Sequence, residues 1–178
     1  MTTMISTARP GALAPLAAAT LHFLCGKLAA GKTTLSHQLA ERHHAVLISE
    51  DLWLRRLYPV EIKTFDDYLV HSRRLREVVG PHVQQLLTCG QSVVLDFPMN
   101  VPSSRAWVRS VFEGAGAGHV LHYVKATDEV CLRQLERRNR ELPEGSVHIS
   151  VEQFEAITRL FREPSPDEGF TIETYVAG

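Results

Sequence analysis

The stretch Gly26-Lys27-Leu28-Ala29-Ala30-Gly31-Lys32-Thr33 decides how the rest of the sequence is interpreted. It fits the pattern G-x-x-x-x-G-K-[ST], in which a glycine-rich turn directs its backbone N–H groups at phosphate oxygens. An apolar run over residues 21–25, typical of a buried strand, precedes it, and a segment with helical spacing over 32–42 follows it. The pattern requires this order of strand, turn and helix, so the sequence predicts a nucleotide phosphate site.

This phosphate loop suggests a role for each of its side chains. Lys32 would reach the β- and γ-phosphates, and the Thr33 hydroxyl would ligate Mg²⁺. Leu28 and Ala29 replace the Pro-Gly pair that is common in kinases, and an alanine forced into a left-handed conformation would cost about 1 kcal/mol. The candidate nucleotide-binding residues of the loop are Gly26, Leu28, Ala29, Ala30, Gly31, Lys32, Thr33 and Thr34.

Apolar runs and helical segments alternate along the rest of the chain. We expect further strands over residues 45–48, 93–95, 120–124 and 170–175. Helices are expected over 51–57, 65–89 with a break at Gly80-Pro81, 103–114, 128–140 and 151–161. Strands that alternate with helices imply a parallel sheet covered on both faces. The sequence therefore predicts one α/β domain over residues 21–178, after a flexible N-terminal extension over 1–20.

Two acidic residues follow the second expected strand. In a sheet of this kind the carboxyl end of that strand faces the same crevice as the phosphate loop. A carboxylate there can accept the proton of an attacking hydroxyl, and Asp51 is the candidate base, with Glu50 the less favoured neighbour. The alternative for Asp51 is a helix N-cap. Arg55 or Arg56 would hold the acceptor or a phosphate.

The third expected strand ends in Asp96, which is the layout of a Walker-B element. Asp96 would hold Mg²⁺ directly or through water. The alternative is a turn-forming aspartate before Phe97-Pro98. Asn100 and Arg105 follow on the same edge and are candidate substrate contacts.

A set of arginines lies in the strongly polar helix expected over 128–140. Arg133, Arg137 and Arg140 repeat at i, i+4 and i+7, and Arg138 lies on the adjoining flank. With Pro143-Glu144-Gly145 they predict a lid whose arginines neutralise the charge of a transferring phosphoryl group. The alternative is a solvated helix face paired with nearby acids. The candidate catalytic residues are thus Lys32, Asp51, Arg133 and Arg137.

Composition excludes several classes of protein. The 178 residues are 44% hydrophobic and 22% charged, which is ordinary for a globular protein and unlike a collagen or a disordered tail. Nineteen basic and 20 acidic residues give a formal charge of -1, so no basic field indicates nucleic acid or anionic membrane. Three distant cysteines form neither a disulfide framework nor a metal motif, which favours the cytoplasm.

Together, these motifs resemble P-loop kinases of the polynucleotide 5′-hydroxyl kinase and zeta-toxin type, within the AAA-type ATPase-like P-loop NTPase superfamily. The C-terminal matches are Ser146-Val147-His148-Ile149-Ser150, Arg159-Leu160-Phe161, Pro164 and Glu168-Gly169-Phe170. The resemblance implies a three-layer fold with a helical lid and five parallel strands in the adenylate-kinase-like order. It also implies a base at Asp51, a lid arginine at Arg133 or Arg137, and a loop from Pro164 to Gly169 near the adenine.

We therefore expect a Mg²⁺- and ATP-dependent kinase that phosphorylates a hydroxyl, with ATP hydrolysis as a side reaction. Phe97-Pro98-Met99-Asn100 stands where the resembled kinases often have Thr-Asn after the acid, which favours a small-molecule acceptor over a nucleic-acid end. The alternatives are a polynucleotide 5′-hydroxyl kinase, an ATP-binding regulatory module, and a nucleotide-sugar toxin that needs a neutralising partner. We expect a cytoplasmic monomer or homodimer without a membrane partner.

Overall fold

The computed structural model describes residues 18–144 and 147–178. Most of the expected extension over residues 1–20 lies outside these ranges, and Thr20 already belongs to the first strand. Gly145 and Ser146, which end the expected lid turn and begin the resembling C-terminal segment, also lie outside the described residues.

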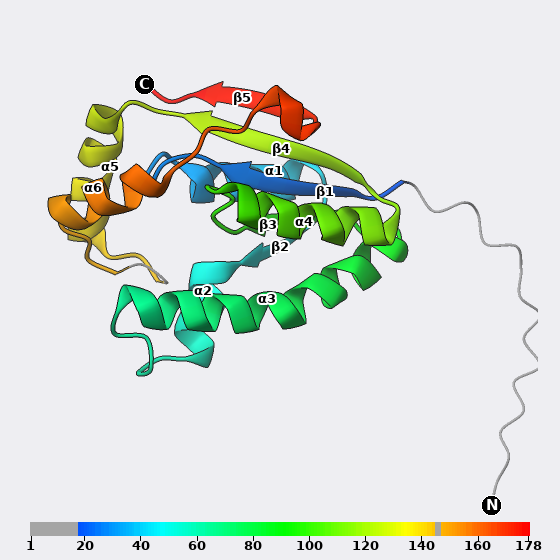
Figure 1. The fold of residues 1–178 in the computed structure, drawn as a ribbon, viewed down its shortest axis with the longest axis horizontal. Helices are drawn as coiled ribbons and strands as arrows, with labels where there is room; N and C mark the ends of the chain where they lie inside the picture. Colours follow the sequence, from blue (N-terminus) through cyan, green and yellow to red (C-terminus); the bar gives the residue numbers. More distant parts are fainter. Residues whose placement is uncertain (1–17, 145–146) are drawn as a thin grey trace, which may run out of the picture.

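Five parallel strands form one sheet, in the order β2-β3-β1-β4-β5. The register pairs Phe23 with both Leu95 and Leu121, and it pairs Ser49 with Asp96. Because all strands run the same way, their carboxyl ends meet at one edge, where the phosphate loop leaves β1 (Figure 1). The strands are β1 Thr20–Cys25, β2 Val46–Ser49, β3 Val93–Asp96, β4 Gly118–Lys125 and β5 Ile172–Val176.

Helices cover both faces of this sheet (Figure 1). Alternate strand residues point to opposite faces, so Phe23 and Leu95 pack with α2, α3 and α4, whereas Leu24 and Val94 pack with α1, α5 and α6. The helices are α1 Lys32–Arg42, α2 Glu50–Leu57, α3 Phe65–Thr88, α4 Pro102–Ala115, α5 Asp128–Glu141 and α6 Val151–Leu160, with a short 3-10 turn at Pro166–Glu168.

The expected break at Gly80-Pro81 is wrong, since α3 is continuous through both residues. Proline in a helix removes one backbone hydrogen bond and crowds the preceding turn, which costs about 3 kcal/mol. Here the two neighbours Val79 and Val83 are fully buried, and Gly80 faces α4 beside Trp107. Packing against α4 along the middle of α3 offsets the local cost of the proline.

The other expected elements are confirmed to within two residues at each end, and α1 has the expected bounds. The architecture is also as expected, with five parallel strands and helices on both sides. Helix α5 with Pro143 and Glu144 is the part of the predicted lid that the structure describes. Within residues 18–144 and 147–178, no helix is both long enough and apolar enough to cross a bilayer.

Candidate active site

The phosphate loop begins in a narrow space at the end of β1. A Cβ atom on Gly26 would lie 2.6 Å from the carbonyl oxygen of Val124 in β4, so only glycine fits there. At the other end of the loop, Gly31 is the N-cap of α1 with φ of 99°, a left-handed conformation, and no side chain caps the helix. The first backbone N–H groups of α1 therefore have no side-chain acceptor in the described structure, which suits an anion.

Ala29 has the left-handed conformation that the sequence left open, with φ of 58°. A side chain disfavours this conformation by about 1–2 kcal/mol. The loop thus keeps a strained alanine where a glycine would be relaxed. Such strain is common where a backbone must present its N–H groups in one fixed direction.

The Lys32 ammonium lies across the loop and holds its two ends together. Its Nζ donates to the carbonyl oxygens of Gly26 and Lys27, at 2.7 Å each. Burial lowers the pKa of Lys32, while the nearby Cys25, Asp96 and Asp51 raise it. The amine therefore lies in a desolvated place where its interaction with an anion is stronger than in water.

Thr33 and Asp96 come together as the sequence predicts. Asp96 accepts hydrogen bonds from Thr33 and, at 3.5 Å, from the Ser49 hydroxyl. Burial raises the pKa of Asp96, and the Thr33 hydrogen bond and the Lys32 charge oppose that effect. In the described part of the chain no group of three or more His, Cys, Asp or Glu side chains could hold a metal. The side-chain oxygen atoms of Thr33 and Asp96 are hard ligands that fit Mg²⁺, and its other ligands would be phosphate oxygens and water.

The two consecutive acids at the start of α2 lie in different environments. Glu50 is completely buried, and its carboxylate accepts hydrogen bonds from Tyr68 (2.7 Å), Ser72 (2.6 Å) and Arg76 (3.4 Å). All three partners come from α3, so Glu50 joins α2 to α3. A carboxylate bound in this way is a poor candidate for a base that meets a substrate.

Asp51 lies instead close enough to Lys32 and Asp96 to interact with their charges. Its side chain is accessible to solvent, yet many protein atoms surround it. Burial, with smaller effects of Glu50 and Asp96, raises the pKa of Asp51 to about 6, against the opposing charges of Arg138 and Lys32. A carboxyl group with a pKa near the working pH can accept a proton and later release it.

Arg138 is the lid arginine that faces Asp51, and the sequence placed it only on the flank of the expected set. Burial lowers the pKa of Arg138, and the Asp51 carboxylate raises it. Its Nε atom is buried and has no hydrogen-bond partner among the described residues. Arg138 is one residue from the predicted Arg137, but only Arg138 has the Asp51 carboxylate as its neighbour. The sequence could not show this, because it depends on the position of α2 relative to α5.

Arg133 and Arg137 belong to a different part of the site. Both are exposed, and Arg133 forms an ion pair with Glu129 at 2.7 Å. They line a pocket of about 500 Å³ beside the phosphate loop. Its other lining residues are Ala30, Gly31, Thr34, Leu35, Gln38, Val124, Gln134, Tyr175, Val176, Ala177 and Gly178.

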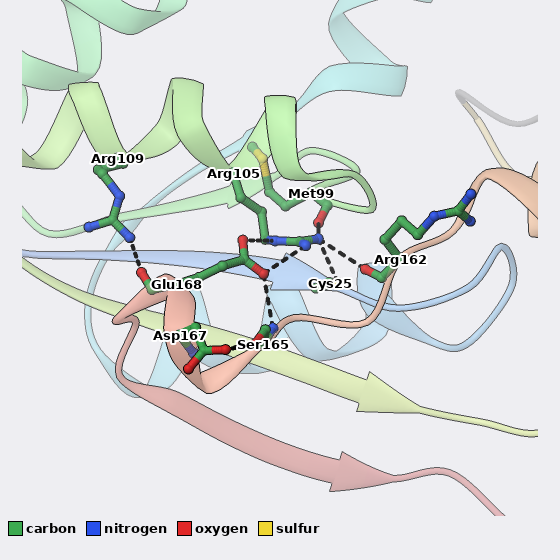
Figure 2. A network of polar contacts seen from close by, with 8 residues as sticks. All are labelled: Cys25, Met99, Arg105, Arg109, Arg162, Ser165, Asp167 and Glu168. Atoms are coloured by element: carbon green, nitrogen blue, oxygen red, sulfur yellow. Dashed lines mark hydrogen bonds and ion pairs between the residues drawn. The ribbon is translucent and has the colours of Figure 1, made fainter.

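Two residues predicted as substrate contacts, Arg105 and Asn100, bond to other parts of the protein. Arg105 is 1% exposed and binds Glu168 and the carbonyl oxygens of Met99 and Arg162 (Figure 2). Because these groups occupy its guanidinium, Arg105 is not available to a substrate. Asn100 lies at the phosphate loop, where its Oδ1 atom accepts a hydrogen bond from the Gly26 backbone N–H at 3.1 Å.

The remaining predicted residues lie apart from the loop or at the rim of the site. Arg55 is exposed on α2, and the neighbouring Arg56 pairs with Glu144 of the lid at 3.0 Å. The loop from Pro164 to Gly169 does not line the pocket. Two residues after Gly169, Thr171 bonds to His119 near the start of β4, at the end of the sheet opposite the phosphate loop.

Many solved structures share this fold, including the following three. A proposed kinase from Chloroflexus aurantiacus has a TM-score of 0.73 at 18% identity, over 90% of this chain and 86% of its own. Chaetomium thermophilum Kti12, solved with ADP-AlF3, has a TM-score of 0.63 at 19% identity, over 88% of each chain. Mycobacterium tuberculosis APS kinase CysC, solved with AMPPNP and APS, has a TM-score of 0.58 at 18% identity, over 89% of each chain.

No curated protein matches the sequence significantly. The AAA_33 family model, described as an AAA domain, matches residues 21–164, which is most of the chain. The narrower resemblance to polynucleotide kinases and zeta toxins stays a prediction. The phosphate loop, the parallel sheet and the family match agree, and the chain therefore belongs to the AAA_33 family of P-loop NTPases.

Proposed function

We propose that this protein is a Mg²⁺- and ATP-dependent kinase that transfers the γ-phosphoryl group to a hydroxyl of a small molecule. One observation carries the proposal most directly. An acid with its pKa raised to about 6, Asp51, lies within electrostatic reach of the phosphate-loop lysine, Lys32, and of the candidate metal ligand, Asp96. A carboxyl group in this position can take the proton of an acceptor hydroxyl.

The residues that would hold the nucleotide lie in the phosphate loop and in the pocket beside it. The loop N–H groups and Lys32 bind phosphate oxygens, and the pocket lined by Arg133 and Arg137 is large enough for a purine base. Thr33 and Asp96 would hold Mg²⁺, which when bound supplies neutralisation of phosphate charge.

The acceptor hydroxyl would meet Asp51 on the other side of the loop. The Asp51 carboxylate takes the hydroxyl proton, and the Arg138 guanidinium stabilises negative charge that develops beside it. Arg55 lies one helical turn beyond Asp51 on α2 and is a proposed contact for the acceptor. We assign no acceptor contact to Arg105, because its donors are occupied inside the protein.

A small molecule is the preferred acceptor, because the formal charge of -1 provides no basic surface for a nucleic-acid strand. APS kinase, which shares the fold, was solved with the small molecule APS. The three cysteines are all free, which supports action in the reducing cytoplasm, and a monomer or homodimer would serve this chemistry.

The test is label transfer from γ-labelled ATP with Mg²⁺, using a metabolite extract in one reaction and a 5′-hydroxyl oligonucleotide in another. We expect label on a metabolite with the wild type and none with Lys32→Ala. Lys63→Ala, which removes an exposed lysine just before α3, is the matched control and should label as the wild type does. Salt-sensitive label on the oligonucleotide would instead identify a polynucleotide kinase. Label only in free phosphate would identify an ATPase without an acceptor.

A further inference from the structure

Asn100 connects the phosphate loop to a distant part of the chain. Its side-chain Oδ1 accepts the Gly26 N–H at 3.1 Å, and its backbone carbonyl accepts the Arg162 N–H at 2.9 Å. Arg162 begins the segment from residue 162 to residue 169, here called the strap, which leads from α6 toward β5. One residue thus holds the first amide of the loop and the first residue of the strap.

Gly26 has little freedom to move independently of Asn100. On one side it approaches the Val124 carbonyl so closely that a Cβ atom would lie at 2.6 Å. On the other side its N–H is bound to Asn100, while its own carbonyl accepts the Lys32 ammonium at 2.7 Å. A hydrogen-bonded path therefore runs from Asn100 through the backbone of Gly26 to Lys32.

Arg105 binds both Met99 and Arg162, which are the residue before Asn100 and the strap residue that bonds to Asn100 (Figure 2). Its Nη1 donates to the carbonyl oxygens of Met99, the preceding residue, and of Arg162, the strap residue that Asn100 binds, at 3.1 Å each. The Nε and Nη2 atoms donate to the two carboxylate oxygens of Glu168 in the strap, at 2.6 and 2.9 Å. A bidentate pair of this kind fixes direction as well as distance.

The strap is held again at its far end. Glu168 also accepts the Ser165 N–H at 2.9 Å, and its backbone carbonyl accepts a hydrogen bond from Arg109 (Figure 2). Arg109 lies over the ring of Phe170, 4.3 Å from its centre. The carboxylate of Glu168 is therefore held in place by groups from the strap and from α4.

We propose that Asn100 is a positioning residue of the nucleotide site, and that the Arg105–Glu168 ion pair acts on that site through Asn100. The inference rests on the proposed function only in that the loop binds a nucleotide. It goes beyond that function, because the strap would then influence nucleotide affinity. The strap lies on the opposite face of the sheet from α1 and α5. A purely structural role would lower stability without this effect.

The test measures ADP affinity by calorimetry, at a temperature at which every variant is folded. Asn100→Ala should weaken ADP binding by about three- to tenfold, because the free loop loses a hydrogen bond that preorganises it and must then be ordered when ADP binds. Gln91→Ala is the matched control, since this side-chain amide also bonds to the backbone, donating to the carbonyls of His44 and Ser92 away from the loop. It should bind ADP as the wild type does, even if its melting temperature falls.

A double-mutant cycle tests the path through Asn100. Glu168→Gln keeps the shape of the side chain but loses the charge, and we expect about two- to fivefold weaker ADP binding in the wild-type background. In the Asn100→Ala background the same change should have no further effect. Equal effects in the two backgrounds, or unchanged affinity in Asn100→Ala, would overturn the inference. If Asn100→Ala does not fold, Asn100→Ser replaces it. A wild type that binds no ADP would instead refute the proposed function.

Discussion

Replacing Asp51 with asparagine should stabilise the folded protein while removing its chemistry. Burial raises the pKa of this carboxyl from its ordinary 3.8 to about 6. The folded state thus holds the Asp51 proton more tightly than the unfolded chain does, and ionising the group costs folding free energy. That cost is absent below about pH 4, grows between about pH 4 and pH 6, and is complete above it. Asparagine has no such cost.

The size of the effect follows from the same displacement of the pKa. A change from 3.8 to about 6 corresponds to about 3 kcal/mol between the charged and neutral forms. Because the Asp51 side chain is accessible to solvent, screening reduces this figure, and we expect a gain of about 1–2 kcal/mol at pH 8. The gain should be smaller at pH 5, where the wild-type carboxyl is largely protonated in the folded state.

The assay is urea denaturation of the nucleotide-free wild type and Asp51→Asn at pH 5 and pH 8. Comparing the two proteins at the same pH cancels the effect of histidine titration on the free energy of unfolding, because both proteins have the same histidines. Asp167→Asn, an exposed aspartate, should change the free energy of unfolding by less than about 0.5 kcal/mol at either pH. An Asp51→Asn protein that is less stable than the wild type at pH 8, or whose gain is the same at both pH values, would refute the reasoning.

Three further predictions concern stability. Glu50→Ala should lower the free energy of unfolding by about 3 kcal/mol, because three α3 side chains lose their buried acceptor; a loss below about 1 kcal/mol in urea denaturation would contradict this. His22 and His122 form a buried pair at 3.0 Å, and burial lowers the pKa of each to about 4, so wild-type stability should fall as the pH drops from about 6.5 to 4. His122→Gln should reduce the fall in melting temperature between pH 7.5 and pH 5, and an unchanged fall would exclude the pair as its source. Ala29→Gly should raise stability by somewhat less than 1 kcal/mol, since relief of the left-handed strain exceeds the entropy that glycine adds to the unfolded chain; a lower denaturation midpoint would show that φ of 58° costs nothing there.

Local patterns were sufficient to predict the fold. The bounds of α1, the alternation of strands and helices, and the meeting of Thr33 with Asp96 all depend on residues close in sequence or on the shared edge of a parallel sheet. The break expected at Gly80-Pro81 is wrong because local helix propensity does not include the packing of α3 against α4. Tertiary packing exceeds a local cost of a few kcal/mol when it extends along a long helix.

The candidate site was less accessible to sequence reasoning. Arg105 was expected at the substrate, but its partner Glu168 lies 63 residues away, and no pattern in the sequence indicates that pair. The choice among lid arginines depends on how α5 is rotated relative to α2, which gives Arg138 the Asp51 carboxylate as its neighbour. The separate environments of Glu50 and Asp51 likewise follow from the position of α3.

The most direct test of the central claim compares nucleotide binding with phosphoryl transfer in Asp51→Asn. The account predicts ADP affinity within about threefold of the wild type, because Asp51 does not belong to the phosphate loop. It predicts at least a hundredfold slower appearance of label on the acceptor, the effect expected of a lost general base. Transfer at the wild-type rate in this variant, with ADP binding intact, would contradict the assignment of Asp51 as the base and with it the proposed kinase mechanism.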